Sequence, residues 1–399
     1  MWLKRFVLCA VPVLALLGYT IFRGAERHND FKYPYNVARH LWKTGQLKIA
    51  SQPRYPVTFH VLLAPIASLP IGQAAAVWAV LSFAAVAALP RVFARLSGIA
   101  PRRQLLAWLV VLPCLIDALV LGQSDPINLL LVAAGLLAVK AGRGGAGAGL
   151  IGTAGMIKFL PVIFWATAIG RCPNRHVWAG ILLALCGGFG MVAAAVGREA
   201  AVAGIVEQYE LIRDYEKPWH LVARGSDLRP NNESLPIVLA RTFGDLGPSG
   251  GRPSVSLARW PLSVIWGLWG GLVLVLATIW VASLSSAAAL PPERGWLGMF
   301  GLTAVVMLAL TPICWHHYFL WTFPAVLFLV QHRRLIAVVG ALSWLGAASQ
   351  LTRGLGCHMV LALVLFAVVA YDLRRSAART GPRAERRQIG PTVALPAAP

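Results

Sequence analysis

The chain has 399 residues, of which 58% are hydrophobic and only 13% are charged, and its mean hydropathy is +0.67. Soluble domains carry about 25% charged residues, so this composition predicts an integral membrane protein. The formal net charge of +21 comes from 36 Lys and Arg against 15 Asp and Glu. In a membrane protein we expect such an excess in cytoplasmic loops and beside lipid phosphates, and we expect no nucleic-acid partner.

The N-terminal stretch to residue 22 has a basic start and an apolar run, as a signal peptide does. It lacks a convincing small-x-small cleavage site, and many apolar runs follow, so we interpret it as a retained signal-anchor. A membrane span needs about 20 apolar residues, and fewer where the helix is short. The sequence predicts twelve helices, at 5–22, 71–96, 104–121, 126–140, 145–157, 159–170, 177–196, 261–283, 296–312, 319–330, 335–351 and 356–372. Several are short for a crossing, and one bent span could replace the pair 145–157 and 159–170.

Lys and Arg in the short loops indicate the orientation. With twelve spans and a cytoplasmic N-terminus, every short-loop cluster falls on the cytoplasmic side, whereas a single span at 145–170 would move the later clusters outside. We therefore expect one polytopic domain over 1–372 in the inner (plasma) membrane, with both termini cytoplasmic. The segment 373–399, rich in Pro, Ala and Arg, is expected to be a disordered tail. Two long polar segments, 23–70 and 197–260, would face outward, and the cations of the first would contact anionic lipids.

One acid lies among cations and aromatic residues just after the first predicted span. The segment reads RHNDFKYPYNVARHLWKTG over residues 27–45. In one interpretation Asp30 is the N-cap of an amphipathic interfacial helix that runs to about Lys43. In the other, Asp30 is a general base that accepts a proton from a hydroxyl nucleophile. The two are compatible, because a capped helix would hold its acid rigidly.

Lys158 interrupts the apolar stretch GGAGAGLIGTAGMIKFLPVIFW. A lysine in an apolar run is costly and usually lines a cavity or meets a partner. The small residues before it permit close helix packing, and Pro161 helps to break the segment. If the two short helices rise and descend, Lys158 lies at the outer end, on the same side as Asp30. We expect it to bind a phosphate; the alternative is a lysine that extends to the membrane interface.

Polar residues also gather where the third and fourth predicted spans meet, in CLIDALVLGQSDPINLLL. Gln123, Asp125 and Asn128 cluster there, and Asp117 lies in the apolar run before them. Asp125 followed by proline is a common helix start, so Asp125 could be only a cap. Asp117 could be a second acid or the buried partner of an arginine.

The sequence indicates no metal or cofactor. The six cysteines have no CxxC or CxxH spacing, and there is no Walker A, no GxGxxG turn ahead of a helix, no DxD and no HExxH. His316 and His317 are adjacent, and neighbouring histidines on a helix point about 100° apart, which makes a poor metal pair. Either one could donate a hydrogen bond to a phosphate, whereas Trp315 and Tyr318 could be interfacial anchors.

Six segments occur in order along residues 30–330: DFKYPYNVARHLWKTG, YPVTFHVLLAPIASLP, GQSDPINLLL, GLIGTAGMIKFLPVIF, NNESLPIVLAR and LTPICWHHYFLWTFP. Together they resemble glycosyltransferase family 87, a bacterial group that includes polyprenol-phosphate-mannose-dependent mannosyltransferases of the C-type membrane superfamily. The chain departs from the family pattern at Val57, where a second proline is common, and at Glu233, where glutamine is usual.

The resemblance implies an all-α membrane protein of about twelve transmembrane helices with its active site at the extracytoplasmic face. It implies that Asp30 is catalytic. Residues expected to bind the donor phosphate are Lys158, His316, His317 and Arg241, and those expected to bind substrate are Tyr33, Gln123, Asn128, Asn232 and Ser234.

The implied reaction moves a hexose, mannose in the first instance, from polyprenyl phosphate to a hydroxyl of an envelope lipid or glycan, with inversion and without a metal or other cofactor. A transporter or lipid flippase is the rival class, because many spans with intramembrane charge suit one as well. The sequence shows no matching broken helices in two halves, which disfavours a transporter. A C-type transferase for another sugar is a further alternative.

Overall fold

The computed structural model describes residues 2–26, 29–48, 55–215, 231–244 and 257–380. Within these residues every regular element is a helix, and the only β-type pairings are two isolated bridges. In chain order the elements are α1 (Trp2–Ala25), α2 (Lys32–Thr44), α3 (Val57–Ala67), α4 (Ile71–Ser97), α5 (Pro101–Val120), α6 (Asp125–Lys140), α7 (Gly144–Ile157), η1 (Leu160–Ile163), α8 (Phe164–Arg171), α9 (Arg175–Val196), α10 (Arg198–Tyr215), α12 (Leu235–Phe243), α13 (Leu262–Ala288), α14 (Pro292–Leu310), η3 (His316–Thr322), α15 (Phe323–Phe328), α16 (Arg333–Ala348), α17 (Gln350–Gly354) and α18 (Cys357–Thr380).

Each of the twelve predicted apolar segments coincides with a helix or with a short 3-10 helix that an α-helix continues. The two short helices predicted between 145 and 170 are separate, as α7 and then η1 with α8. In the part of the chain that the structure describes, six helices are long and apolar enough to cross a membrane alone, namely α4, α5, α9, α13, α14 and α18. The crossing of the other six remains a prediction.

The predicted C-terminal boundary needs one correction. Helix α18 runs on to Thr380, so residues 373–380 of the expected disordered tail are helical. The apolar pattern ends near residue 372, but Ala, Arg and Ser continue the helix because Ala and Arg are good helix formers. Residues 381–399 lie outside the described part.

The loops that were predicted to be cytoplasmic gather at one end of the bundle. Lys140, at the end of α6, donates to the backbone carbonyls of Arg95 and Leu96 at the end of α4, at 3.3 and 2.9 Å. Its Nζ also lies 2.9 Å from Oε1 of Glu293 at the start of α14. The side chains that join these loops therefore bring together helix ends that are far apart in sequence.

The loops predicted to face outward gather at the opposite end. The Asp30 backbone N–H donates to the Leu121 carbonyl at 3.0 Å, which joins the segment before α2 to the end of α5. The Glu233 N–H donates to the Cys314 carbonyl at 2.7 Å, which joins the segment before α12 to the residues after α14. This alternation of ends is the arrangement expected when successive helices run up and down.

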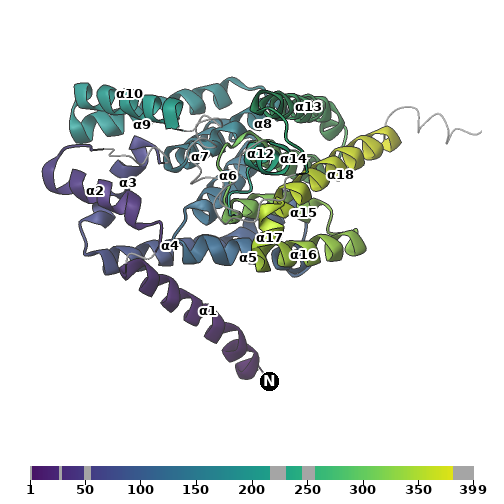
Figure 1. Cartoon of the computed structure of the whole chain (residues 1–399), viewed down its shortest axis with the longest axis horizontal. Coiled ribbons are helices and arrows are strands. Elements are labelled where there is room, and N and C mark those ends of the chain that lie inside the picture. Colours follow the sequence, from purple (N-terminus) through teal and green to yellow (C-terminus); the bar gives the residue numbers. More distant parts are fainter. Residues whose placement is uncertain (1, 27–28, 49–54, 216–230, 245–256, 381–399) are drawn as a thin grey trace, which may run out of the picture.

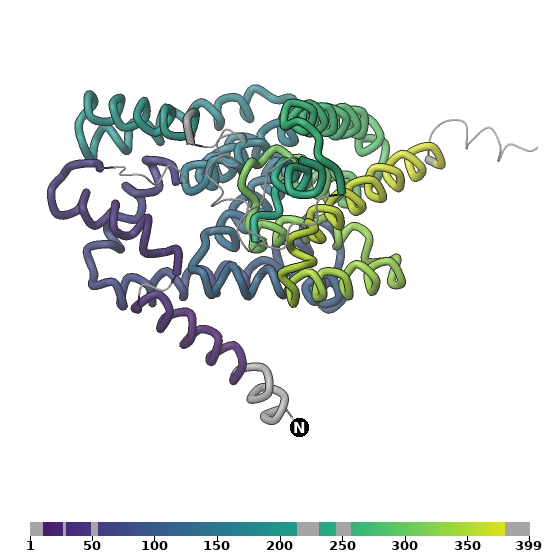
Figure 2. Tube along the Cα trace, in the orientation of Figure 1, coloured from purple at the N-terminus to yellow at the C-terminus, as the bar shows by residue number. Residues whose placement is uncertain are grey.

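Among the described residues of the two long segments between predicted spans there are four helices, α2, α3, α10 and α12. Figure 1 shows α2 and α3 side by side at the left of the view, and α18 leaving the body at the right. Helix α1 projects from the body and packs on α4, and the tube in Figure 2 traces α9 and α10 along the top.

Arg39 of α2 donates to the carbonyls of Ala67, Ser68 and Leu69 at 2.8, 3.0 and 2.7 Å. This cation of the first segment therefore stabilises the end of α3, and is not free for lipids.

Small residues allow the helices in the centre of the bundle to pack closely. Helices α6 and α7 are so close that a Cβ on Gly147 would lie 2.5 Å from the Gly135 carbonyl oxygen, which confirms the predicted close packing before Lys158. Helix α14 is the central helix, and every residue from Gly295 to Ala309 is buried. A helix that is apolar on all sides is expected to be surrounded in this way.

Candidate functional site

A buried ion pair lies where α6 begins and α7 ends. The Lys158 ammonium donates to both carboxylate oxygens of Asp125, at 3.2 and 2.9 Å, and the two side chains are only 7% and 1% exposed. Asp125 is the first residue of α6, and its Oδ1 also accepts from the indole N–H of Trp321 at 2.9 Å. The interpretation of Asp125 as only a cap is therefore wrong, because its carboxylate compensates a buried lysine.

Aromatic and imidazole rings from η3 complete this cluster. The Lys158 Nζ lies 3.7 Å from the centroid of the Tyr318 ring, a cation–π distance. Tyr318 therefore faces the lysine, and not only the membrane interface. The buried His317 ring lies between two acids, with Nε2 3.8 Å from Oδ2 of Asp125 and Nδ1 3.7 Å from Oδ2 of Asp117. Among the described residues Asp117 has no arginine partner, and its carboxylate faces the two histidines.

Asp30 lies just before α2, but it does not cap the helix. The cap position is occupied by Phe31 without a side-chain cap bond, and α2 ends where Gly45 adopts φ +67°. The Asp30 Oδ2 instead accepts from the Gln123 side-chain amide at 2.7 Å. The predicted N-cap role is thus wrong, because the carboxylate turns toward the polar segment between α5 and α6.

Tyr55 joins Asp30 in a hydrogen-bonded chain through Gln123. Its hydroxyl lies 3.3 Å from Oε1 of Gln123, so Gln123 bridges Tyr55 and Asp30. Burial raises the pKa of Tyr55, the positive charge of Lys158 opposes this, and the negative charge of Asp30 adds to it. The hydroxyl is therefore a neutral donor that feels the electrostatic influence of both charges. Tyr55 was not among the expected site residues, and its only signal was its place in the YPVTF segment.

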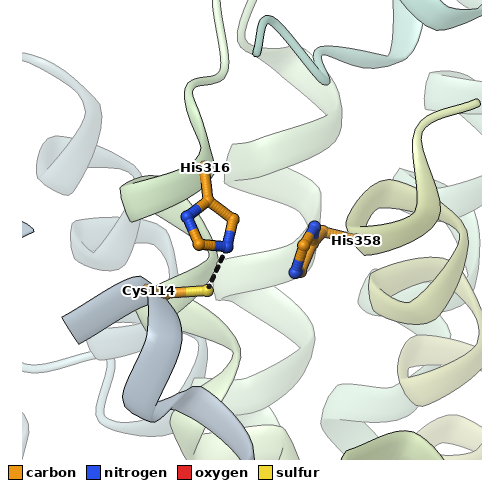
Figure 3. A group of neighbouring side chains, drawn as sticks. All are labelled: Cys114, His316 and His358. Carbon is orange, nitrogen blue, oxygen red and sulfur yellow. Dashed lines mark hydrogen bonds between the residues drawn. The ribbon is translucent and has the colours of Figure 1, made fainter. Parts of the chain in front are cut away.

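A second cluster lies beside the first, and its parts come from α5, η3 and α18. The Nε2 of His316 is 3.5 Å from the Sγ of Cys114, and its ring centroid is 4.5 Å from that of His358. Figure 3 shows the three side chains converging on one another. Burial lowers the pKa of His316, and the hydrogen bond to Asp117 opposes that shift. His358 is held by Glu233, whose Oε1 lies 3.0 Å from its Nδ1.

The Asn232–Ser234 segment has a different environment from the one expected for substrate binding. The Asn232 Oδ1 accepts from the backbone N–H groups of Cys314 and Ser234, at 3.0 and 3.2 Å. The Ser234 hydroxyl donates to the Pro312 carbonyl at 2.8 Å. Both side chains are buried and hold this segment against the residues after α14, which gives them a structural part.

The remaining expected residues are spread around these clusters. Asn128 is buried three residues after Asp125, and its amide donates to the Ser124 hydroxyl at 3.2 Å. Arg241 is buried on α12 near the Arg353 carbonyl, 3.5 Å away, and burial lowers its pKa to about 10 with Glu233 opposing. Tyr33 is exposed on α2, with the Lys32 ammonium 4.9 Å from its ring centroid. Among the other expected residues, Gln123 contacts Asp30, and Lys158 and His317 both lie beside Asp125.

An apolar groove opens beside the polar cluster. It has a volume of about 380 Å³ and is formed by α3, η1 and α7 to α10, with lining residues that include Val57, Met156, Phe159, Trp165, Gly188 and Phe189. Val57 lies two residues after Tyr55, and Met156 two residues before Lys158. The groove therefore meets the polar cluster at the segments that carry two of its members.

The fold and the site define a helical membrane protein with a carboxylate, a buried lysine and an apolar groove at one end of the bundle. The family comparison agrees in class, because the model of glycosyltransferase family 87 matches residues 54–294. The chain belongs to glycosyltransferase family 87, which confirms the resemblance drawn from its segments. No curated protein and no solved structure matches the chain significantly. Lys158, Gln123 and Arg241 fall within the matched residues, whereas Asp30 and the two histidines lie outside them.

Proposed function

We propose that the protein is an inverting transferase that moves a hexose, in the first instance mannose, from a polyprenyl-phosphate sugar to a hydroxyl of an envelope lipid or glycan. The reaction would take place at the extracytoplasmic face of the inner membrane, with both chain termini in the cytoplasm. The observation that carries the proposal is the Asp30 carboxylate held by Gln123, together with the buried Lys158 ammonium, both of which act electrostatically on the buried Tyr55 hydroxyl. A base and a cation are the two groups that an inverting transfer from a lipid phosphate needs.

Asp30 is the proposed general base. Its Oδ2 accepts from Gln123, which orients the carboxylate and leaves Oδ1 to accept the proton of the acceptor hydroxyl. The acceptor oxygen then attacks the anomeric carbon while the bond from that carbon to the phosphate oxygen breaks. The configuration inverts, the proton remains on Asp30, and polyprenyl phosphate leaves.

Lys158 and His317 are proposed to stabilise the leaving phosphate. An ammonium has three N–H donors. Two are directed at Asp125 and the Tyr318 ring covers the third side, so a phosphate oxygen would replace either the ring or one carboxylate oxygen. Asp125 compensates the lysine before the donor binds, and the lysine gains a second anionic partner as charge develops on the phosphate. His316 and Arg241 face other partners, so the scheme does not require them.

The apolar groove supports a lipid-linked substrate. Exposed polar surface is scarce along it, and its walls include Phe159, Trp165 and Phe189. A hydrocarbon chain could pass from the bilayer into the groove without leaving an apolar environment, so no desolvation of polar groups would oppose its binding. The groove would hold the first part of a chain whose headgroup reaches Tyr55 and Lys158.

The scheme uses only groups of the chain and the two substrates. The donor carries its own activation, since its bond to phosphate breaks in the reaction, so no cofactor and no metal takes part in the transfer itself. Partners are thus the lipid-linked sugar, the acceptor and membrane lipids, and no nucleic acid.

The experiment is a transfer assay with purified protein in liposomes. Radiolabelled polyprenyl-phosphate mannose is supplied with envelope lipids as acceptors, and wild type is compared with Asp30→Asn. Glu26→Gln is the matched control, because Glu26 is an exposed acid four residues before Asp30. We expect wild type and the control to form labelled product and release polyprenyl phosphate, and Asp30→Asn to be at least a hundredfold slower.

The same assay tests the alternatives. Full activity of Asp30→Asn would exclude Asp30 as the base. If wild type transfers no mannose but transfers another sugar from a panel of donors, the sugar is wrong and the class is right. Movement of the labelled lipid across the bilayer without cleavage would contradict a transferase.

A further inference from the structure

The cluster of Cys114, His316 and His358 has the composition and spacing of a metal site. One ligand atom from each residue lies within 4.8 Å of the other two, and all three side chains are buried. Figure 3 shows them converging from three separate elements, α5, η3 and α18. The expectation that the chain has no zinc site rested on the absence of closely spaced ligands in the sequence. Such spacing cannot detect ligands that are distant in sequence and that only the fold brings together.

One separation can be compared with zinc geometry. Bond lengths of about 2.3 Å to sulfur and 2.0–2.1 Å to nitrogen place the two atoms about 3.6 Å apart in a tetrahedral site. The observed distance between the Cys114 Sγ and the His316 Nε2 is 3.5 Å. An ion can therefore enter between these two atoms with little movement of either side chain.

Both histidines have carboxylates behind them. The His316 Nδ1 is 3.4 Å from Oδ2 of Asp117, and the His358 Nδ1 is 3.0 Å from Oε1 of Glu233. Metal-binding histidines almost always donate their other ring nitrogen to such a partner, which fixes the ring and the tautomer. In this arrangement each Nδ1 carries the proton, and each Nε2 is the nitrogen that can bind a metal. The His358 Nε2 now lies 3.1 Å from the Ser343 carbonyl, and it would exchange this contact for the ion.

We propose that Cys114, His316 and His358 together bind one zinc ion. A thiolate and two neutral imidazoles form a ligand set typical of zinc, and three protein ligands leave a fourth position for water. On binding, the Cys114 thiol releases its proton to solvent. The ion would tie η3 to α5 and α18, and η3 also carries His317, Tyr318 and Trp321. None of its three ligands is a group that the proposed transfer reaction uses.

The test is metal analysis of the full-length protein, purified in detergent without chelators. We expect about one equivalent of zinc per chain in wild type, and a loss of most of it in Cys114→Ser and in His358→Gln. Cys314→Ser is the matched control, because Cys314 is a buried cysteine close in sequence to His316 that is not one of the three ligands. This variant should retain zinc.

A second readout identifies the ligands directly. Cobalt(II) exchanged into wild type should give a thiolate-to-cobalt charge-transfer absorption, which Cys114→Ser loses and Cys314→Ser keeps. Thermal unfolding of the zinc-loaded protein should occur at a higher temperature than that of the zinc-free protein. Absence of zinc from wild type even after incubation with zinc salts, or equal zinc content in Cys114→Ser, would overturn the proposal. Because neither readout uses sugar transfer, these results do not depend on the proposed function.

Discussion

Replacing Lys158 by methionine should destabilise the protein strongly, because it leaves a buried carboxylate without its counter-charge. Asp125 is fully buried, and after the change it would keep only the Trp321 N–H, at 2.9 Å, and the His317 ring, at 3.8 Å. Breaking a buried pair by removing one partner costs about 3–5 kcal/mol. We expect a loss of this size in the free energy of unfolding, measured by denaturant titration in mixed micelles with the tryptophan fluorescence as the signal.

The double variant Lys158→Met with Asp125→Asn distinguishes the effect of the unpaired Asp125 charge from the effect of the changed side-chain volume. The asparagine keeps an acceptor oxygen for Trp321 and removes the unpaired charge, so most of the lost stability should return, to within about 1–2 kcal/mol of wild type. Lys140→Met is the matched control, because its partner Glu293 is 45% exposed and can be hydrated when the pair is lost. Activity should remain absent in the double variant. A single variant as stable as wild type would refute the buried ion pair.

Three predictions rest on close contacts at glycines and on one amide. Gly147→Leu should lower the free energy of unfolding by about 1–3 kcal/mol or more, because its Cβ would meet a carbonyl of α6 at 2.5 Å. The control is Gly149→Leu in the same helix, whose side chain points into open space. This variant should unfold like wild type in a thermal assay. Gly188→Trp should fill the apolar groove and raise KM for the lipid donor at least tenfold, while Gly187→Trp, which has no neighbour within 4 Å, should leave KM unchanged. Gln123→Leu removes the bond that orients Asp30, so kcat should fall about tenfold to a hundredfold, a range set by about 1.5–3 kcal/mol for a hydrogen bond to a charged group. Thermal stability should fall as well, because the buried Tyr55 hydroxyl loses its acceptor. An unchanged kcat would show that the carboxylate is oriented by other groups.

The helices could be predicted from sequence because each depends on a local run of apolar residues. The separation of α7 from α8 followed from Lys158 and Pro161 together with the charges of later loops. The partners of the site could not be predicted in this way. Asp125 and Lys158 are 33 positions apart, and Asp125 before a proline has the same sequence pattern as an ordinary helix start. His358 has no polar neighbour in sequence that indicates Glu233, and only the fold places these two residues in contact.

The position of the ion pair follows from the way α6 and α7 are joined. The two helices form an antiparallel hairpin, so the N-terminus of α6 and the C-terminus of α7 lie at the same end. Asp125 lies in the first turn of α6, where the helix dipole favours a negative charge, and Lys158 is the C-cap of α7, where it favours a positive one. Both charges are therefore stabilised by their own helices before they meet each other, which lowers the cost of burying the pair in an apolar bundle. Because Lys158 has an extended backbone that ends α7, its side chain leaves the helix at the polar end, where it meets Asp125.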